Sequence, residues 1–407
     1  GYSRNTTPNI DRFAKGSIRF SRAIANSSWT TASVSSFMSS QLPQTTLAVV
    51  RDGKICQALP DDERAGISPK CITVAEKLHD LGYVTAGITS NPQYSTRNNG
   101  NQGFDFFDES SMTKEITSPS VVSVARKWIA DNKNERFFLF SLLLDTHSPY
   151  RKHTGFDFDP DYRGKDANEI VINGQKNSST TQHMRDLYDS GIAYTDHHVG
   201  LLLDDLKKRG VYDESLIVVM SDHGEEFRDH GQLFHGMTLY KELVSVPLII
   251  KLPYQTQGRV VDGEFSLTDL FPTILQALSS DPAAIRPDGR AVDLAKVREL
   301  RDQHVFGQTE LKNAGLRSVQ DSKYKYILRM YDSKERLYDL VKDPLEKRNI
   351  AADQPKLTAA FKKMIMDKNA TVCANVSLPD GPMMMSRQGK SNNGAVANKM
   401  RSLGYLQ

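Results

Sequence analysis

The sequence has few cysteines and no long hydrophobic run. Cys56, Cys71 and Cys373 are scattered, and no two of them form a Cys-x-x-Cys pair, which excludes a disulfide framework. No apolar stretch is long enough to span a membrane, and the chain does not begin with a signal-peptide pattern. These absences favour a soluble domain and slightly favour the cytoplasm. Because the first residue is Gly1 and not methionine, the compartment stays open.

The sequence also lacks a strong charge of either sign. It has 52 lysines and arginines against 49 aspartates and glutamates. A nucleic-acid binder needs a clustered basic face, so this near balance does not indicate a nucleic-acid partner. The 407 residues exceed the usual size of a single domain. We therefore expect one large domain with a smaller one appended to it.

Helices and strands alternate through most of the chain. Apolar residues at helical spacing predict helices, and the continuous apolar runs that follow them predict strands buried on both faces. This alternation predicts an α/β fold over residues 1–290, with a mostly parallel sheet flanked by helices. The predicted helix–strand pairs are 72–81 with 83–89, 121–130 with 137–144, and 187–206 with 216–220.

The pattern changes in the last third of the chain. Short strand-like segments predict a small C-terminal α+β subdomain with an antiparallel sheet at residues 291–377, closed by a helix at 356–366. Residues 378–407 are rich in Gly, Ser and Asn, which predicts a loosely ordered tail with a short terminal helix. The polar stretch 151–181 is expected to run over the surface and to shape a substrate entrance.

The predicted strand 216–220 ends in the sequence Ser221-Asp222-His223-Gly224-Glu225. Ligand-binding loops of open α/β sheets gather at the carboxyl ends of strands, so Asp222 and His223 are candidate metal ligands. A carboxylate oxygen with an imidazole nitrogen suits Zn, Mn or Fe better than an all-oxygen calcium site. An ordinary turn is the alternative, because Asp and Gly are common in turns. The crowding of His230 and His235 nearby makes that alternative the weaker one.

Two other stretches carry polar side chains of interest. His147 follows the predicted strand 137–144, again just past a buried strand. Residues 27–40 are rich in hydroxyl side chains, which can cap a helix or present a nucleophile, and from the residues alone capping is the preferred interpretation. Within the long helix, we expect Asp196, His197 and His198 to have structural roles.

Five stretches occur in order along the chain: Thr6-Thr7-Pro8-Asn9-Ile10-Asp11, 29–40, Asp145 to Tyr150, Ser221 to Glu225, and 239–250. Together they resemble the sulfatase family of the alkaline phosphatase superfamily. The residues near 337–344 and 403–405 are similar to the small C-terminal subdomain of that family. The resemblance therefore covers nearly the whole chain and implies an alkaline-phosphatase-like fold.

The resemblance implies one divalent metal ion, Mn, Zn, Mg or Ca, held by Asp222, His223 and a nucleophile from residues 29–33. It also implies a further aspartate on a first strand, which should lie just before Gly1. No buried strand precedes the opening helix, so we expect the chain to lack that strand and one metal ligand. Glu225 is expected to orient His223 through a hydrogen bond.

The nucleophile position departs from the formylglycine sulfatases, whose pattern is Cys or Ser, any residue, Pro, any residue, Arg. Aligned on it, Thr30 occupies the Cys position, Ala32 the Pro position and Val34 the Arg position. A threonine cannot mature to formylglycine, and His235 stands where the family has a sulfate-contacting lysine. The arrangement resembles the Thr-nucleophile lipoteichoic-acid synthases and phosphoethanolamine transferases. Thr31 and Ser33 remain rivals of Thr30.

The resemblance implies a hydrolase of sulfuric or phosphoric esters that forms a covalent Thr30 ester, with a small molecule or a glycan or lipid ester as substrate. His147 and His235 are expected to bind the non-bridging oxygens or to protonate the leaving group, and His230 is the next candidate, for binding substrate. A phosphoglycerol- or phosphoethanolamine-type transferase is the first alternative. A non-catalytic binding protein with a degraded metal site is the second.

Overall fold

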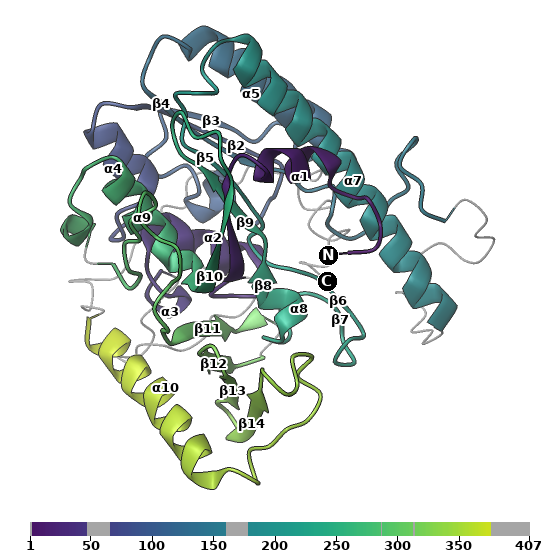
Figure 1. Ribbon diagram of the computed structural model, residues 1–407, viewed down its shortest axis with the longest axis vertical. Coiled ribbons are helices and arrows are strands. Elements are labelled where there is room, and N and C mark those ends of the chain that lie inside the picture. The colour runs from purple at the N-terminus through teal and green to yellow at the C-terminus, as the bar shows by residue number, and fades with distance from the viewer. Residues whose placement is uncertain (1, 47–65, 160–177, 286, 312–313, 376–407) are drawn as a thin grey trace.

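The computed structural model describes residues 2–46, 66–159, 178–285, 287–311 and 314–375. Helices surround a central sheet, and a second, four-stranded sheet forms the lower end of the molecule in Figure 1. The predicted tail 378–407 and Cys56 lie outside the described residues, as does most of the excursion 151–181. Among the described residues no helix combines the length and the apolar character needed to cross a bilayer.

The central sheet has the strand order β10-β1-β9-β5, with β8 also paired to β1. β1 is parallel to β10, whereas β9 is antiparallel to both β1 and β5, so this sheet is mixed. The sequence predicts no strand at β1, because two arginines and a serine interrupt its apolar residues. Its burial instead alternates in part, with Ile18 and Phe20 buried and Arg19 and Ser21 exposed. The strands are β1 (Ile18–Ile24), β5 (Ile217–Met220), β8 (Ser245–Val246), β9 (Leu248–Lys251) and β10 (Arg259–Ser266).

A smaller, wholly parallel sheet has the order β3-β2-β4. Its strands confirm the predicted alternation, since a helix precedes both β2 and β4, and a helix again separates β4 from β5. The α/β class is therefore confirmed. The strands are β2 (Val84–Thr89), β3 (Phe106–Asp108) and β4 (Phe137–Leu142); the helices are α4 (Val74–Asp80), α5 (Ser118–Asn132) and α7 (Ser178–Lys208).

Helices cover both faces of the central sheet. In β9, Leu248 and Ile250 belong to one apolar cluster with residues of α2, α4 and α9, whereas Ile249 between them belongs to a second cluster with α1, α5 and α7. Adjacent strand residues point to opposite faces, so the two clusters are the two sides of a sheet buried on both faces. These helices are α1 (Pro8–Ala14), α2 (Thr30–Ser39) and α9 (Leu270–Ala277), with the short α3 (Pro43–Thr46) and α8 (Lys241–Val244) beside them.

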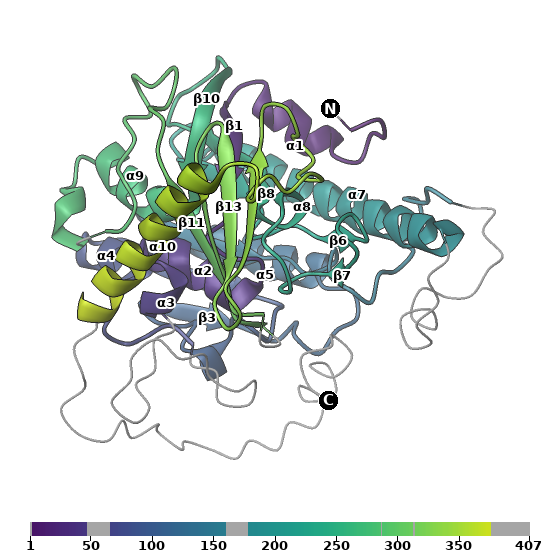
Figure 2. The same cartoon turned by 90° about the horizontal axis from the view of Figure 1, so that it is seen from below.

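A four-stranded antiparallel sheet, β11-β12-β13-β14, forms the C-terminal part of the described chain. Helix α10 lies across this sheet, as Figure 2 shows from below. Its Phe361 and Ile365 belong to one buried apolar cluster with Val319, Tyr326 and Leu337 of the sheet. The predicted α+β subdomain is thus present, with a longer helix than expected. Its elements are β11 (Val305–Thr309), β12 (Leu316–Gln320), β13 (Tyr324–Arg329), β14 (Lys334–Asp339) and α10 (Pro355–Asn375). The remaining elements are β6 (Glu226–Phe227), β7 (Leu233–Phe234) and the 3-10 turns Thr96–Asn98, Leu267–Asp269 and Pro282–Ile285.

Candidate active site

Asp222 and His223 follow the carboxyl end of β5. The ring nitrogen Nδ1 of His223 lies 2.8 Å from the carbonyl oxygen of Gly224. A carbonyl only accepts, so Nδ1 carries the proton and Nε2 keeps its lone pair. Gly224 permits this turn, since a Cβ there would come within 2.1 Å of the Glu242 carbonyl oxygen. His223 is therefore oriented by a backbone carbonyl and not, as we expected, by Glu225.

Thr30 brings its hydroxyl to that lone pair. Its Oγ1 lies 3.3 Å from His223 Nε2, and the side-chain amide of Asn91 donates to the same oxygen at 3.2 Å. Thr30 is the first residue of α2 and is almost completely buried. A hydroxyl held between an imidazole acceptor and an amide donor has its lone pairs and proton fixed in direction, as a nucleophile requires.

The rival hydroxyls have other partners. Thr31 donates to the backbone carbonyl of Gln93 at 2.7 Å, and Ser33 donates to the Asp222 carbonyl at 2.6 Å. The expectation that these hydroxyls cap α2 is wrong, because the N-cap residue is Trp29 and no side chain makes the capping bond. The cause is long-range: loops from the ends of β2 and β5 compete successfully for the hydroxyl groups.

Asn91 was not among the residues that the sequence singles out. It is the second residue after β2, as Asp222 is the second residue after β5, and His147 lies a few residues past the end of β4. Its position past a buried strand is the signal that could have identified it, because the ends of neighbouring parallel strands meet at one edge of the fold. The side-chain oxygen Oδ1 of Asn91 accepts a hydrogen bond from the backbone nitrogen of Gln93 at 2.9 Å. This bond fixes the side-chain amide so that its nitrogen faces Thr30.

The distances from His223 Nε2 to Asp222 and to Thr30 are close to those between two ligands of one divalent ion. His223 Nε2 lies 3.6 Å from Asp222 Oδ2 and 3.3 Å from Thr30 Oγ1. Ligands about 2.1 Å from a tetrahedral zinc ion lie roughly 3.4 Å from one another. A carboxylate, a hydroxyl and an unprotonated imidazole nitrogen also form a donor set that suits zinc or manganese. The residues present therefore fit the metal that the sequence predicts.

His147 and His235 lie beside His223. The ring centroids of His223 and His235 are 4.4 Å apart, and those of His147 and His235 are 4.8 Å apart. Both carboxylate oxygens of Glu225 lie 3.2 Å from His235 Nδ1, so Glu225 orients this histidine. Three predicted histidines and one glutamate thus come together from the ends of β4 and β5.

Burial determines the protonation of this group. Desolvation, followed by the nearby His235, lowers the pKa of His147 to about 3, so His147 is neutral at pH 7. Its Nδ1 lies 2.6 Å from the Ser148 carbonyl and therefore carries the proton. Desolvation also raises the pKa of Glu225 to about 7. A carboxyl group with that pKa can either donate or accept a proton near neutral pH.

The structure places His230 in a different environment. Its Nδ1 lies 2.6 Å from Glu242 Oε1, and its Nε2 lies 2.9 Å from the Glu346 carbonyl oxygen. The ring also stacks on Tyr240, with centroids 3.6 Å apart. His230 therefore links the loop after β5 to the segment that follows β14, and these contacts do not bring it to Thr30.

Residues of the long helix α7 have the structural roles that we expect from the sequence. Both carboxylate oxygens of Asp196 accept hydrogen bonds from the backbone nitrogens of Asn9 and Ile10, at 3.0 and 2.8 Å. Asp196 thus fixes the first turn of α1 against α7. His198 is buried and packs edge-on against Tyr194, whereas His197 is exposed.

A second group of possible metal ligands lies near the N-terminal end of α7. Asp159, His183 and Asp186 have ligand atoms within 4.8 Å of one another. His183 Nδ1 already lies 3.2 Å from Asp159, and the guanidinium of Arg4 pairs with Asp186. A cation there would compete with Arg4, so Asp222 and His223 remain the better candidate ligands.

Comparison with known proteins identifies the family of this chain. The family model described as "Sulfatase" matches residues 1–280. The chain belongs to the sulfatase family. This family member is 28% identical over 267 residues to a choline-sulfatase of Rhizobium meliloti, a match that covers 62% of this chain and 49% of the relative. The chain thus spans about half the length of the curated relatives it matches.

Solved structures of other proteins show the same fold. A protein in complex with its substrate D-glucosamine-2-N,6-O-disulfate has a TM-score of 0.67 at 17% identity, covering 91% of this chain and 94% of that one. A phosphonate monoester hydrolase of Agrobacterium radiobacter has a TM-score of 0.68 at 16% identity, covering 91% and 92%. At these identities the likeness shows that this sulfatase-family chain has their fold.

Proposed function

We propose that this chain is a metal-dependent hydrolase of sulfuric or phosphoric esters that acts through a covalent ester of Thr30. The observation that carries the proposal is the hydroxyl of Thr30 held 3.3 Å from His223 Nε2, at the carboxyl edge of β5. Membership of the sulfatase family supports ester hydrolysis. The choice of Thr30 is supported by the contacts that hold the hydroxyls of Thr31 and Ser33 elsewhere.

Each residue has a distinct task in the proposed reaction. Asn91 donates a hydrogen bond to Thr30 Oγ1 and so stabilises the oxygen once its proton is lost to solvent. The oxygen attacks the sulfur or phosphorus in line, the bond to the leaving alcohol breaks, and the paired His235 and Glu225 supply the proton that the alcohol needs. Water then attacks the Thr30 ester and passes one proton to the same pair, while the departing Thr30 oxygen takes a proton from solvent and becomes a hydroxyl again. Asp222, His223 and Thr30 would hold the divalent ion, which when bound would favour the ionised hydroxyl and polarise the ester oxygens.

The substrate class is proposed to be an ester on a sugar, glycan, lipid or other small alcohol. Among the similar proteins, the choline-sulfatase is named for a small sulfate ester, and one solved structure holds a disulfated glucosamine. The phosphonate monoester hydrolase supports phosphoryl substrates as well. The formylglycine pattern of sulfate-specific relatives is missing, and a threonine stands at position 30. This residue favours phosphoryl over sulfuryl substrates. It also makes a transferase the second candidate function.

A substrate panel separates these possibilities. The full-length natural protein is offered an aryl sulfate, a phosphate monoester, a phosphate diester and a phosphonate monoester, each with Mn, Zn, Mg or Ca. We expect metal-dependent turnover of at least one ester, its loss in Thr30→Ala, and its retention in the matched variant Thr31→Ala. Bound metal without turnover of any ester contradicts hydrolysis and favours the transferase or the non-catalytic alternative. Turnover that survives Thr30→Ala contradicts the proposal that Thr30 is the nucleophile.

A further inference from the structure

The hairpin of β6 and β7 carries both members of the proposed proton-supplying pair, Glu225 and His235. The two strands are antiparallel, with Glu226 opposite Phe234. Glu225 comes directly before this pairing and His235 directly after it, and Glu225 Oε1 lies 3.2 Å from His235 Nδ1. The geometry of the pair therefore depends on how firmly the hairpin is closed.

The side chain of Glu226 closes this hairpin from the inside, with an exposed fraction of 0%. Its Oε1 accepts hydrogen bonds from the backbone nitrogens of His230 and Gln232, at 3.0 and 2.8 Å, both in the turn between β6 and β7. Its Oε2 accepts from the hydroxyl of Thr238 at 3.0 Å. Because Thr238 follows His235 in the chain, a single carboxylate holds the backbone on both sides of His235.

The backbone just before His235 needs such a restraint. Phe234 has a φ of 69°, in the left-handed region that a residue with a bulky side chain rarely adopts. A residue persists there only where the surrounding contacts over-determine its conformation. The hydrogen bonds of Glu226 on both sides of Phe234 are contacts of this kind. They act on the residue whose conformation determines where the next side chain, His235, points.

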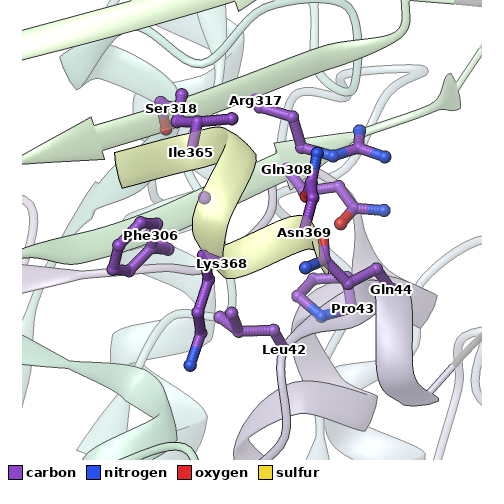
Figure 3. A pocket seen from close by; sticks show the side chains of 11 residues that line it. Leu42, Pro43, Gln44, Phe306, Gln308, Arg317, Ser318, Ile365, Lys368 and Asn369 are labelled. Carbon is purple, nitrogen blue, oxygen red and sulfur yellow. The ribbon is translucent and has the colours of Figure 1, made fainter. Parts of the chain in front are cut away.

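The C-terminal subdomain restrains the backbone after His235. Thr309, the last residue of β11, donates its hydroxyl to the carbonyl of Gly236 at 2.6 Å. Earlier residues of β11 line the narrow recess shown in Figure 3. This contact fixes Gly236 to the second sheet, whereas Glu226 joins the segment at Thr238 to the turn of the hairpin.

We propose that Glu226 is a positioning residue of the active site, which holds His235 against Glu225 so that the pair delivers its proton to the leaving alcohol. Glu226 is fully buried and its oxygens are bonded to the loop, so it acts through the backbone. A misplacement of about 1 Å can cost roughly a hundredfold in rate, so loss of this restraint should slow the step that needs the proton. The effect on turnover rests on the proposed hydrolysis, whereas the effect on the pair itself does not.

The first test uses two esters that differ in their need for a proton, the phenyl and the 4-nitrophenyl ester of the acid that the substrate panel identifies. Phenoxide is the poorer leaving group and needs the proton, whereas 4-nitrophenoxide leaves without one. Thr238→Val removes one partner of Glu226 with little change of shape. We expect it to lower kcat/KM at least about tenfold for the phenyl ester and less than about threefold for the 4-nitrophenyl ester.

Three further variants sharpen this test. Thr238→Ser restores the hydroxyl and should recover the wild-type ratio of the two kcat/KM values. Glu226→Leu removes all three hydrogen bonds and should act like Thr238→Val but more strongly. Thr358→Val is the matched control, because it loses a hydroxyl hydrogen bond of 2.9 Å to a backbone carbonyl in the C-terminal subdomain and should leave the ratio unchanged. Thr238→Val keeps the test valid if Glu226→Leu does not fold, which circular dichroism shows.

The second test needs no turnover. The ring 15N resonances of His235 report the hydrogen bond at Nδ1, and they are assigned in the metal-free full protein by comparison with His235→Asn. We expect the Nδ1 resonance to shift in Thr238→Val and to return in Thr238→Ser. If the wild type hydrolyses no ester, the proposed function fails, and this resonance still decides the role of Glu226.

Two results would overturn the inference. Equal losses of kcat/KM for the two esters in Thr238→Val would show that Glu226 supports the fold without positioning the pair. An Nδ1 resonance that stays in place in the folded variants Thr238→Val and Glu226→Leu would show that His235 keeps its partner without Glu226.

Discussion

Two histidines from one loop, His223 and His230, have opposite environments. His223 has one ring nitrogen held by a carbonyl, while the other faces the hydroxyl of Thr30. His230 has both nitrogens hydrogen bonded and one ring face stacked on Tyr240. The difference is that the partners of His230 are permanent parts of the fold, whereas the Nε2 of His223 has a weak partner that an ion or a reacting group can replace. An imidazole is available for chemistry only where the fold leaves one nitrogen in such a position.

The surroundings of His230 extend into the second sheet. The Glu346 side chain accepts from Lys325 Nζ at 3.1 Å, and the two side chains are 2% and 1% exposed. The backbone nitrogen of Lys241 also donates to Glu346. This network, which we call the subdomain joint (His230, Glu242, Glu346, Lys325 and Lys241), is saturated with partners and should determine stability. The group around His223 should determine activity.

The largest effect should follow from His223→Ala. Loss of the imidazole removes a metal ligand and the partner of Thr30, so we expect turnover to fall by at least about a thousandfold and metal binding to weaken with it. The melting temperature without metal should change little. Turnover is measured with the best ester of the substrate panel, and metal binding by titration calorimetry. Wild-type metal affinity in this variant would remove His223 from the site.

Lys325→Met should have the largest effect on stability. It leaves the buried carboxylate of Glu346 without its ion partner, and breaking such a pair from one side costs about 3–5 kcal/mol of unfolding free energy. Urea denaturation measures the change, and the exposed Lys323→Met is the matched control. The folded fraction should keep a near-normal turnover per molecule. A variant as stable as wild type would show that the subdomain joint contributes little.

His230→Ala tests the comparison between the two histidines directly. It removes two hydrogen bonds and a stacked ring, so we expect a loss of about 2 kcal/mol in unfolding free energy and less than a tenfold change in turnover. The exposed His304→Ala should change neither quantity appreciably. If His230→Ala abolishes turnover while the protein stays folded, His230 belongs to the catalytic group, and the proposed substrate-binding role becomes the better interpretation.

A smaller effect should appear in the pH dependence of stability. Burial raises the pKa of Glu225 to about 7, above its ordinary value of 4.5, so between these values the folded state holds a proton that the unfolded state has lost. Glu225 therefore contributes a fall in the unfolding free energy of the metal-free protein as pH rises from 4.5 to 7, whereas His147, whose pKa is lowered from 6.5 to about 3, contributes a rise between pH 3 and 6.5. Glu225→Gln cannot titrate, so between pH 4.5 and 7 the unfolding free energy of this variant should rise more steeply with pH, or fall less, than that of the wild type. An identical slope in the two proteins would show that Glu225 is ionised throughout.

Sequence alone predicts those features that depend on local pattern. The alternation of helix and strand, the position of Asp222 and His223 past β5, and the candidacy of Thr30 all follow from periodicity, from the residues that end strands, or from family motifs. The features it misses depend on partners far along the chain. Glu346 lies 116 residues from His230, and Asn91 lies 61 residues from Thr30, so no local signal reports either contact.

The strand β1 was missed for a related reason. Its two arginines break the apolar run expected of a buried strand, yet Arg22 reaches Glu264 of the neighbouring β10. The partner strand thus compensates the charge that makes β1 look like a loop. The capping expectation for α2 failed in the same way, because Asp222 and Gln93 lie outside any window around residue 30.

The pairing of β1 with β10 also has a consequence for synthesis on the ribosome. Ile18 pairs with Arg259, and Ile24 pairs with Ser266. At about 5–20 residues per second, roughly 240 further residues take some 10 to 50 s to emerge. During that interval the buried residues of β1 have no parallel partner, so the nascent chain exposes a strand edge that invites aggregation. The central sheet of this protein is thus completed only after residue 266 has emerged, and a chaperone that shields β1 until then would prevent this aggregation.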